Sequence, residues 1–230
     1  MGDPWAAHRR RAEVLRERYS FASQVLTLYI ALTEAWAVST PDDVAERVVK
    51  ATIESGPSLL ADEVRDLDPD VVVAAWLSGG ELSPVEQYLA RACLVPQHKH
   101  AVTPLGERLC PHCGGLPQLS FRQVSEPLVS EPRRLLCSRC AEVWTYSRSA
   151  CASCGETESA QRPLYAEENG ILSPHLGIDA CLSCRHYLVD VDVGRDRDAV
   201  PEVDELAALP LDLYAADQGL TKITPNIMGF

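Results

Sequence analysis

Four Cys-x-x-Cys pairs constrain this chain of 230 residues more than any other feature. They are Cys110/Cys113, Cys137/Cys140, Cys151/Cys154 and Cys181/Cys184. A Cys-x-x-Cys on a tight turn directs two thiolates at one position, so each pair supplies half of a tetrahedral metal site. Four pairs therefore predict two metal ions.

The spacing of the pairs favours sequential pairing. The first and second pairs are separated by 23 residues and the third and fourth by 26, and each of these gaps has room for a hairpin. Only 10 residues separate the second pair from the third. The two expected ligand sets are Cys110, Cys113, Cys137 and Cys140, and Cys151, Cys154, Cys181 and Cys184. An interleaved pairing stays open, because sequence fixes ligand type better than ligand pairing. Zinc and iron both stay open, because tetrahedral sulfur suits either metal.

The amino-terminal stretch bears on the cellular compartment. Residues 1–19 are charged and contain no apolar signal region, so we expect a cytoplasmic protein whose cysteines bind metal rather than form disulfides. Residues 21–38 are the most apolar stretch, but polar side chains such as Gln24 and Glu34 interrupt it. A membrane span needs about 20 nearly uninterrupted apolar residues. We therefore expect a buried helix and no membrane insertion.

The formal net charge is -12. Residues 1–106, 107–190 and 191–230 each carry more acidic than basic side chains. Proteins that bind nucleic acids usually present a basic patch, because phosphate contacts dominate their affinity. The charge distribution therefore disfavours nucleic acid as a partner.

Residues 5–93 read as helices. Apolar side chains from Val14 to Leu32 recur at helical spacing and predict one long first helix. Later helices are expected to start at Thr40-Pro41, Asp68-Pro69 and Ser83-Pro84, because a capping oxygen followed by proline is typical of helix starts. The ninth cysteine, Cys93, lies on an apolar helical face and is expected to be a buried structural thiol.

The cysteine region reads as short strands and turns. Residues 143–148 alternate and place Trp144 and Arg148 on one face, and residues 187–193 alternate with their valines inward and their aspartates outward. Gly114 and Gly155 follow the second cysteine of their pairs, where a positive φ lets backbone N–H groups turn toward sulfur. Such modules are too small for a core of their own, so metal must supply much of their folding free energy.

The carboxyl-terminal part reads as a helix over residues 202–217. Pro210 is expected to break or kink it, and Gly219 to end it. The fold class is therefore α+β, with an amino-terminal helical bundle, two tandem zinc-ribbon or rubredoxin-like four-cysteine modules and a carboxyl-terminal helix. The expected boundaries are 1–106 for the helical part with its linker, 107–149 and 150–193 for the ribbons, and 194–230 for the last helix and tail.

The motifs follow one another in a specific order. They are Cys110-Pro-His-Cys113-Gly114, Leu116-Pro117, Leu135-Leu136-Cys137, Trp144, Arg148, Cys151-Ala-Ser-Cys154-Gly155-Glu156, Cys181-Leu-Ser-Cys184, Tyr187-Leu188 and the stretch from Asp204 to Leu213. This order resembles the formate dehydrogenase accessory protein (FdhE) family over residues 107–230. Two features depart from the family pattern: the helical part is short, and Pro210 replaces an ordinary helix former.

The resemblance implies a cytoplasmic factor that is not an enzyme. Members bind the catalytic subunit of a formate dehydrogenase and assist its maturation before export, and iron is associated with their rubredoxin-like ribbons. Trp144 and Arg148 are candidate partner contacts, since aromatic and arginine side chains are enriched in binding hot spots. A core tryptophan with an arginine lying over the strand is the competing interpretation.

Two other functions stay open. Zinc ribbons commonly bind nucleic acids, although the acidic charge argues against that use here. An iron-loaded four-cysteine site could transfer electrons as rubredoxins do. No nucleophile adjoins a base in the sequence, so no catalytic residues are predicted.

Overall fold

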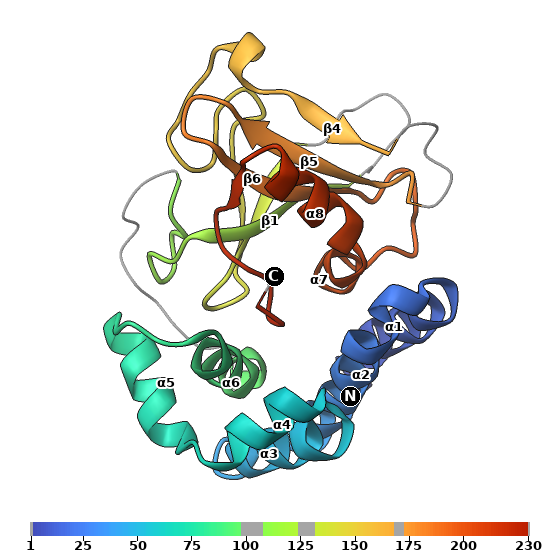
Figure 1. Ribbon diagram of the computed structural model, residues 1–230, viewed down its shortest axis with the longest axis vertical. Coiled ribbons are helices and arrows are strands. Elements are labelled where there is room, and N and C mark those ends of the chain that lie inside the picture. The colour runs from blue at the N-terminus through green and yellow to red at the C-terminus, as the bar shows by residue number, and fades with distance from the viewer. Residues whose placement is uncertain (1, 98–107, 124–131, 168–172, 230) are drawn as a thin grey trace. The chain divides into compact units, whose positions relative to one another are not determined.

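The computed structural model describes residues 2–97, 108–123, 132–167 and 173–229. The chain divides into two units, residues 1–99 with 227–229, and residues 100–226 with 230. The first unit is helical, and the second contains a β-sheet followed by short helices (Figure 1). The α+β class predicted from the sequence is confirmed.

The helical unit contains six α-helices within residues 2–97. They are α1 (Ala6–Arg18), α2 (Ser23–Val38), α3 (Val44–Ser55), α4 (Ser58–Arg65), α5 (Pro69–Ser78) and α6 (Pro84–Leu94), with 3-10 turns at Ser20–Ala22 and Val95–Gln97. The prediction of a single long first helix is wrong, because the backbone is extended at Tyr19 (φ -121°, ψ 94°), and this residue separates α1 from α2. Val14 and Phe21, which the periodicity joined, are each 47% exposed.

Two of the three predicted helix caps are confirmed. The Asp68 carboxylate accepts the backbone N–H groups at the start of α5, and Ser83 forms a reciprocal capping box with Glu86 at the start of α6. The start at Thr40-Pro41 is wrong, because α3 begins at Val44. The Asp43 carboxylate accepts the N–H of Thr40 and pairs with Arg47, which holds a turn before the helix.

Within the described residues, Ser20–Val38 is the one helical stretch long and apolar enough to cross a membrane by length and composition. Its α2 part buries Leu28 and Leu32 in the helical unit, and the indole of Trp36 donates to the carbonyl of Ala92 at 2.9 Å. This is the burial expected of a core helix. Cys93 is 1% exposed, and burial raises the pKa of its thiol to about 12, as expected of a structural cysteine.

The second unit contains a seven-stranded mixed sheet in the described residues. Its strands are β1 (Pro117–Arg122), β2 (Arg134–Cys137), β3 (Val143–Thr145), β4 (Leu164–Ala166), β5 (Leu176–Cys181), β6 (His186–Asp192) and β7 (Thr221–Lys222). The order is β3-β2-β1-β6-β5-β4, with β7 beside β6. Neighbours are antiparallel except for β1 with β6 and β6 with β7, which are parallel. Both predicted ribbons contribute strands to this one sheet. The boundary predicted between the ribbons stays a prediction.

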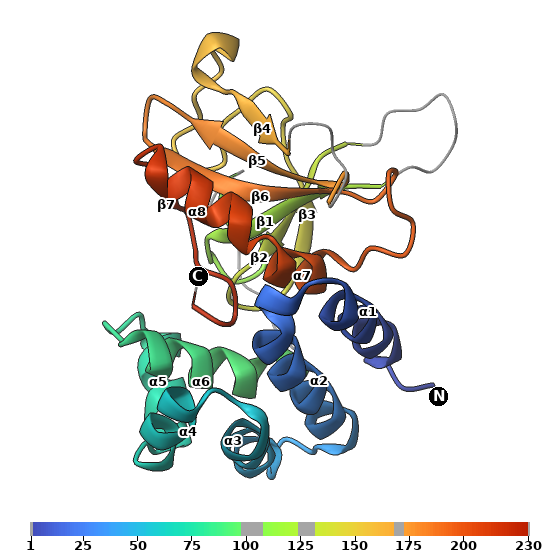
Figure 2. The same ribbon diagram turned by 45° about the vertical axis from the view of Figure 1, so that its right-hand side comes forward.

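The carboxyl-terminal helices cover one face of the sheet (Figure 2). They are α7 (Pro201–Asp204), a 3-10 turn (Glu205–Ala207) and α8 (Leu209–Asp217). The predicted break is confirmed, because Pro210 lies in the first turn of α8, where it needs no N–H partner. Leu119 of β1, Val189 of β6 and Ala208 meet in the core between these layers.

Two strand predictions need correction. The strand expected over 143–148 ends at Thr145, so Trp144 is buried whereas Arg148 is exposed beyond the strand. Asp190 of β6 does point away from the valines, but it is 6% exposed rather than outward in solvent. It is buried because Ser120 and Arg122 donate hydrogen bonds to its carboxylate.

Candidate metal centres

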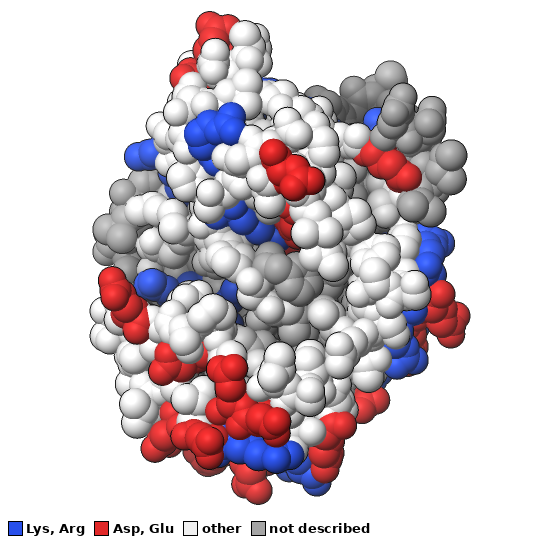
Figure 3. Space-filling model, viewed as in Figure 1, with Lys and Arg blue, Asp and Glu red and all other residues white. Residues whose placement is uncertain are grey.

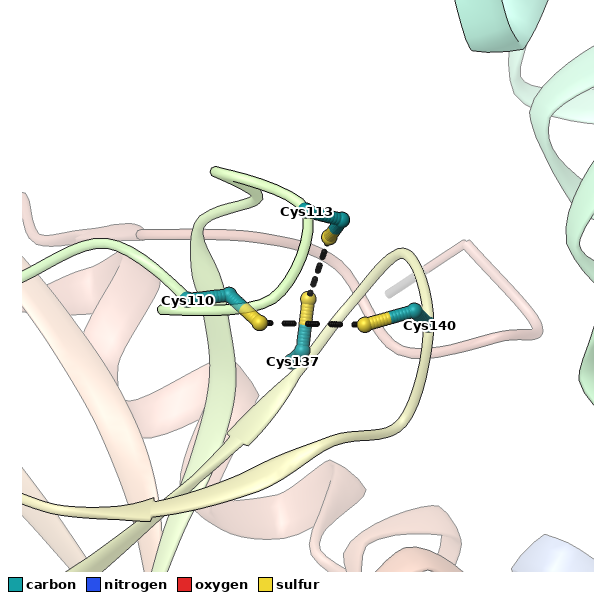
Figure 4. Close-up of side chains that lie close together, drawn as sticks. All are labelled: Cys110, Cys113, Cys137 and Cys140. Carbon is teal, nitrogen blue, oxygen red and sulfur yellow. Dashed lines mark hydrogen bonds between the residues drawn. The ribbon is translucent and has the colours of Figure 1, made fainter. Parts of the chain in front are cut away.

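The first cysteine cluster lies at one end of strands β1 and β2. Cys110 and Cys113 precede β1, Cys137 ends β2, and Cys140 follows in the turn to β3. Their side chains point toward one another (Figure 4), with 3.7 Å between the sulfurs of Cys110 and Cys140 and 3.4 Å between those of Cys113 and Cys137. The structure therefore brings together the four residues of the first predicted set.

The second cluster repeats this arrangement on the next three strands. Cys151 and Cys154 precede β4, and Cys181 and Cys184 lie in the turn between β5 and β6. The sulfur of Cys151 is 3.8 Å from that of Cys184, and the sulfur of Cys154 is 3.7 Å from that of Cys181. The grouping is the sequential one.

Both clusters have the dimensions of a tetrahedral metal site. Within each set, all four sulfurs lie within 4.8 Å of one another. Four thiolates at about 2.3 Å from a common metal would be separated by about 3.8 Å, close to the observed distances. The nine cysteines all lie in the described residues, and none forms a disulfide. Both clusters are therefore suited to bind a metal ion.

The backbone turns that position the sulfurs share one geometry. The residue after the second cysteine of each pair has a positive φ: 71° at Gly114, 54° at Ala141, 82° at Gly155 and 62° at Arg185. The prediction at the two glycines is confirmed, whereas the sequence offered no signal at Ala141 and Arg185. The guanidinium of Arg185 donates to the carbonyl of Gln218, which anchors the fourth turn.

Backbone N–H groups also point at the sulfurs. The first cysteine of three pairs accepts from the N–H two residues on: Cys110 from His112 at 3.4 Å, Cys137 from Arg139 at 3.3 Å, and Cys151 from Ser153 at 3.3 Å. Such bonds stabilise a thiolate and orient it as a ligand. They belong to the turn itself and so accompany the Cys-x-x-Cys spacing.

The thiols of the first cluster compete for negative charge in the absence of a cation. Hydrogen bonding with Cys137 and Cys140 holds the pKa of Cys113 far below its ordinary value. Hydrogen bonding to Cys113 raises the pKa of Cys137 and raises that of Cys140 to about 12. Four thiolates this close repel one another, so a bound cation is what would allow all of them to ionise.

The two candidate partner residues lie in different surroundings. Trp144 is 9% exposed and packs with Cys110, Leu135 and Cys137 in the core beneath the first cluster. This position matches the core role that the sequence left open for the tryptophan. Arg148 is exposed, and its backbone carbonyl accepts a hydrogen bond from Arg162 at 2.9 Å.

A buried polar group near α7 was missed at the level of sequence. His175 is 2% exposed, and its Nε2 lies 2.7 Å from the carboxylate of Asp204, which is fully buried. The second oxygen of Asp204 accepts the N–H of Val200 at 2.8 Å. Asp196 completes a possible three-ligand set with these two side chains. Because Asp204 already holds the loop before α7 to His175, this group is explained as a structural hydrogen-bond network.

Comparison with known proteins gives concordant results. The family model described as FdhE, C-terminal domain, matches residues 149–228. The protein called Protein FdhE homolog in Aquifex aeolicus is 33% identical over 121 residues, covering 53% of this chain and 41% of that protein. The homologue of that name in Pseudomonas aeruginosa is 34% identical over 122 residues, covering 52% of this chain and 39% of that protein. The matched part thus spans about two fifths of these relatives' length.

The fold is also shared with a solved structure. The crystal structure of the FdhE protein from Pseudomonas aeruginosa superimposes with a TM-score of 0.72 at 21% identity, covering 98% of this chain and 95% of that one. At this identity the likeness concerns the fold alone. The family model and the relatives, together with the cysteine clusters in their sequential order, support the similarity of this chain to the FdhE family.

Proposed function

We propose that the chain is a cytoplasmic maturation factor for a formate dehydrogenase, that it binds the catalytic subunit before export, and that it does so without turning over a substrate. The observation that carries the proposal is the pair of four-cysteine clusters within a chain that is similar to the FdhE family. The family name indicates a formate dehydrogenase as the partner protein, and the clusters would provide a rigid surface that recognises it.

The chemistry of the clusters supports binding rather than catalysis. Four cysteine sulfurs fill the tetrahedral coordination of one metal and leave no open position for a substrate. A metal there holds two turns in place and stabilises the module around them. Loops fixed in this way lose little conformational entropy when a partner binds, and that favours affinity.

Arg148 is the residue through which we propose to test the binding surface. It is exposed and lies in the segment between the first cluster and the second. Arginine is enriched among the residues that dominate protein–protein binding energy. Trp144 supports this surface from the core, because it anchors β3, which ends at Thr145, shortly before the arginine.

Co-purification with the catalytic subunit of a formate dehydrogenase tests the proposal. The bait is intact protein containing both metals, beside an Arg148→Ala variant with the same metal content. Arg197→Ala is the matched control, because Arg197 is also exposed and lies in the same unit. We expect intact protein and the control to recover the subunit, and Arg148→Ala to recover at least about tenfold less, which corresponds to about 1.4 kcal/mol.

The other outcomes of this experiment are also informative. Recovery of nucleic acid at physiological salt, with no dehydrogenase subunit, would support the nucleic-acid alternative instead. The acidic side chains that gather over α3 and α4 on the face in Figure 3 make that result unexpected. Normal binding by Arg148→Ala would keep the client and reject the surface. Reversible reduction of a bound iron in the absence of any partner would favour the electron-transfer alternative.

A further inference from the structure

A pocket lies in the second unit, on the face of the sheet that α7 and α8 leave uncovered. Alternate residues of a strand face opposite sides, so Ser120 and Asp190 lie away from the core valines that meet those helices. The pocket has a volume of about 270 Å³. Its lining is Arg122, Arg133, Arg148, Ser149, Thr157, Ser159, Arg162, Leu164, Asp179 and Asp190.

The pocket is positive although the chain is strongly acidic. Four arginines face two aspartates in its lining, whereas the whole chain has a net charge of -12. Asp179 is shared by two of the arginines, Arg133 at 2.6 Å and Arg162 at 2.9 Å. Each carboxylate can balance only one guanidinium, so the lining keeps an excess of positive charge.

The positive charge of Arg122, the remaining arginine that pairs with an aspartate of the lining, is nearly balanced by carboxylates. Asp190 pairs with Arg122 at 2.8 Å, and Asp192, outside the lining, also approaches Arg122 at 3.3 Å. Asp192 in turn lies 3.6 Å from Arg195. The surplus charge therefore belongs to the part of the pocket formed by Arg133, Arg148 and Arg162.

The arginines also keep hydrogen-bonding capacity. Among the described residues, neither the Nε of Arg133 nor that of Arg162 has a hydrogen-bond partner, although both atoms are buried. Two hydroxyl-bearing residues of the lining, Thr157 and Ser159, are exposed. Guanidinium forks and hydroxyl donors together match the oxygens of a phosphate group.

We propose that this pocket binds the phosphate group of a small organic phosphate or of free phosphate. A phosphate monoester carries a charge of about -1.5 to -2 at pH 7, which matches the excess of two arginines better than a single carboxylate does. The volume is close to the lower end, about 300 Å³, of pockets that hold small organic ligands. The binding of phosphate here goes beyond the proposed maturation role and does not depend on it.

Calorimetric titration of the metal-loaded protein tests the proposal, with inorganic phosphate, adenosine monophosphate and acetate as separate ligands at constant ionic strength. The test variant is Arg148→Gln, because its side chain is exposed and its backbone carbonyl, which holds Arg162, is unchanged. Arg197→Gln is the control with the same change in charge. We expect saturable phosphate binding that weakens about tenfold in Arg148→Gln and less than twofold in the control.

Tighter binding of the nucleotide would identify the ligand as an organic phosphate, and equal binding would identify free phosphate. The proposal is overturned if neither phosphate ligand binds saturably, if acetate binds as tightly as phosphate, or if both variants weaken binding equally. Weaker phosphate binding in Arg148→Gln with retained co-purification of the dehydrogenase subunit would support the phosphate site and reject Arg148 as a partner contact.

Discussion

The two cysteine modules share one backbone plan and differ in how tightly their clusters are enclosed. In both, a Cys-x-x-Cys turn precedes a strand, and a second Cys-x-x-Cys turn follows the next strand. The N–H of Cys110 donates to the carbonyl of Gly115, and the N–H of Cys151 donates to that of Glu156, so these two positions correspond. At this shared position one module has no side chain, and the other has a long acidic one.

The difference follows from what surrounds each position. A Cβ at Gly115 would lie 2.8 Å from the sulfur of Cys137 and 3.2 Å from that of Cys113, so only glycine fits there. Glu156 has room, and its carboxylate accepts from the hydroxyl of Ser183 at 2.8 Å, which links the two turns of the second cluster. Spacing thus determines where the sulfurs lie, whereas the neighbouring residues determine how each cluster is closed.

Loss of one ligand should have the largest effect in either module. In Cys137→Ser and in Cys181→Ser we expect the metal content to fall by one ion per chain, with unfolding of that module in thermal melts. Structural zinc contributes about 10–16 kcal/mol to the folding of small zinc peptides. Cys93→Ser is the control, because it buries a hydroxyl at a cost of about 1–3 kcal/mol and leaves both clusters intact. Equal losses in all three variants would show that the clusters do not support the fold.

An added methyl group should separate the modules more finely. Gly115→Ala places its Cβ against two sulfurs, so we expect metal affinity at the first cluster to fall about 10- to 100-fold. Gly155→Ala meets only Arg108, at 3.8 Å, but its φ of 82° is strained for alanine. We expect that variant to lose about 1–2 kcal/mol of stability with its metal content unchanged. Competition with a chelator of known affinity measures both, and equal affinity losses would contradict the comparison.

Exposure should set the order in which the metals leave. Cys154 is exposed, whereas the cysteines of the first cluster are buried or half-buried. A chelator can therefore approach the second cluster more easily, and we expect it to remove that metal several-fold faster. Two kinetic phases, with the faster one absent in Cys181→Ser, would support this order. A single phase in the intact protein would indicate equivalent clusters.

The link between Glu156 and Ser183 should contribute least. The Glu156 carboxylate accepts hydrogen bonds from the backbone N–H of Glu158 and from the hydroxyl of Ser183. These bonds, the first more than the second, lower the pKa of the Glu156 carboxyl, so the folded state favours its charged form. Glu156→Ala should lower the melting temperature slightly, by less than Gly115→Ala, and should not change the metal content. A Ser183→Ala variant should reproduce the change, and the double variant should add little more. A larger loss than in Gly115→Ala would contradict this ranking.

The sequence predicted the features that a few adjacent residues determine. Cysteine spacing favoured the two sets of four cysteines that the structure brings together, and glycine after a second cysteine was enough to expect positive φ at Gly114 and Gly155. Ala141 and Arg185 adopt the same conformation without a glycine, because the turn imposes it on whatever residue stands there. Local chemistry was sufficient where the motif itself was the constraint.

Features that depend on distant residues were not predicted. The parallel pairing of β1 with β6 joins residues that are far apart in the sequence, such as Ser120 and Asp190 at a separation of 70 positions. No local sequence pattern predicts this pairing. The burial of Asp190 follows from that pairing, because Ser120 and Arg122 come from the neighbouring strand. The break at Tyr19 was missed because apolar residues continued at helical spacing across it.

The metal content of the protein tests the central claim most directly. The protein should be purified without added metal and without chelators, and its metal measured by elemental analysis against a concentration from quantitative amino-acid analysis. Two clusters of four sulfurs predict close to two ions per chain, of zinc, iron or both. A value near one, or near zero, in protein that circular dichroism shows to be folded would contradict the two-site account.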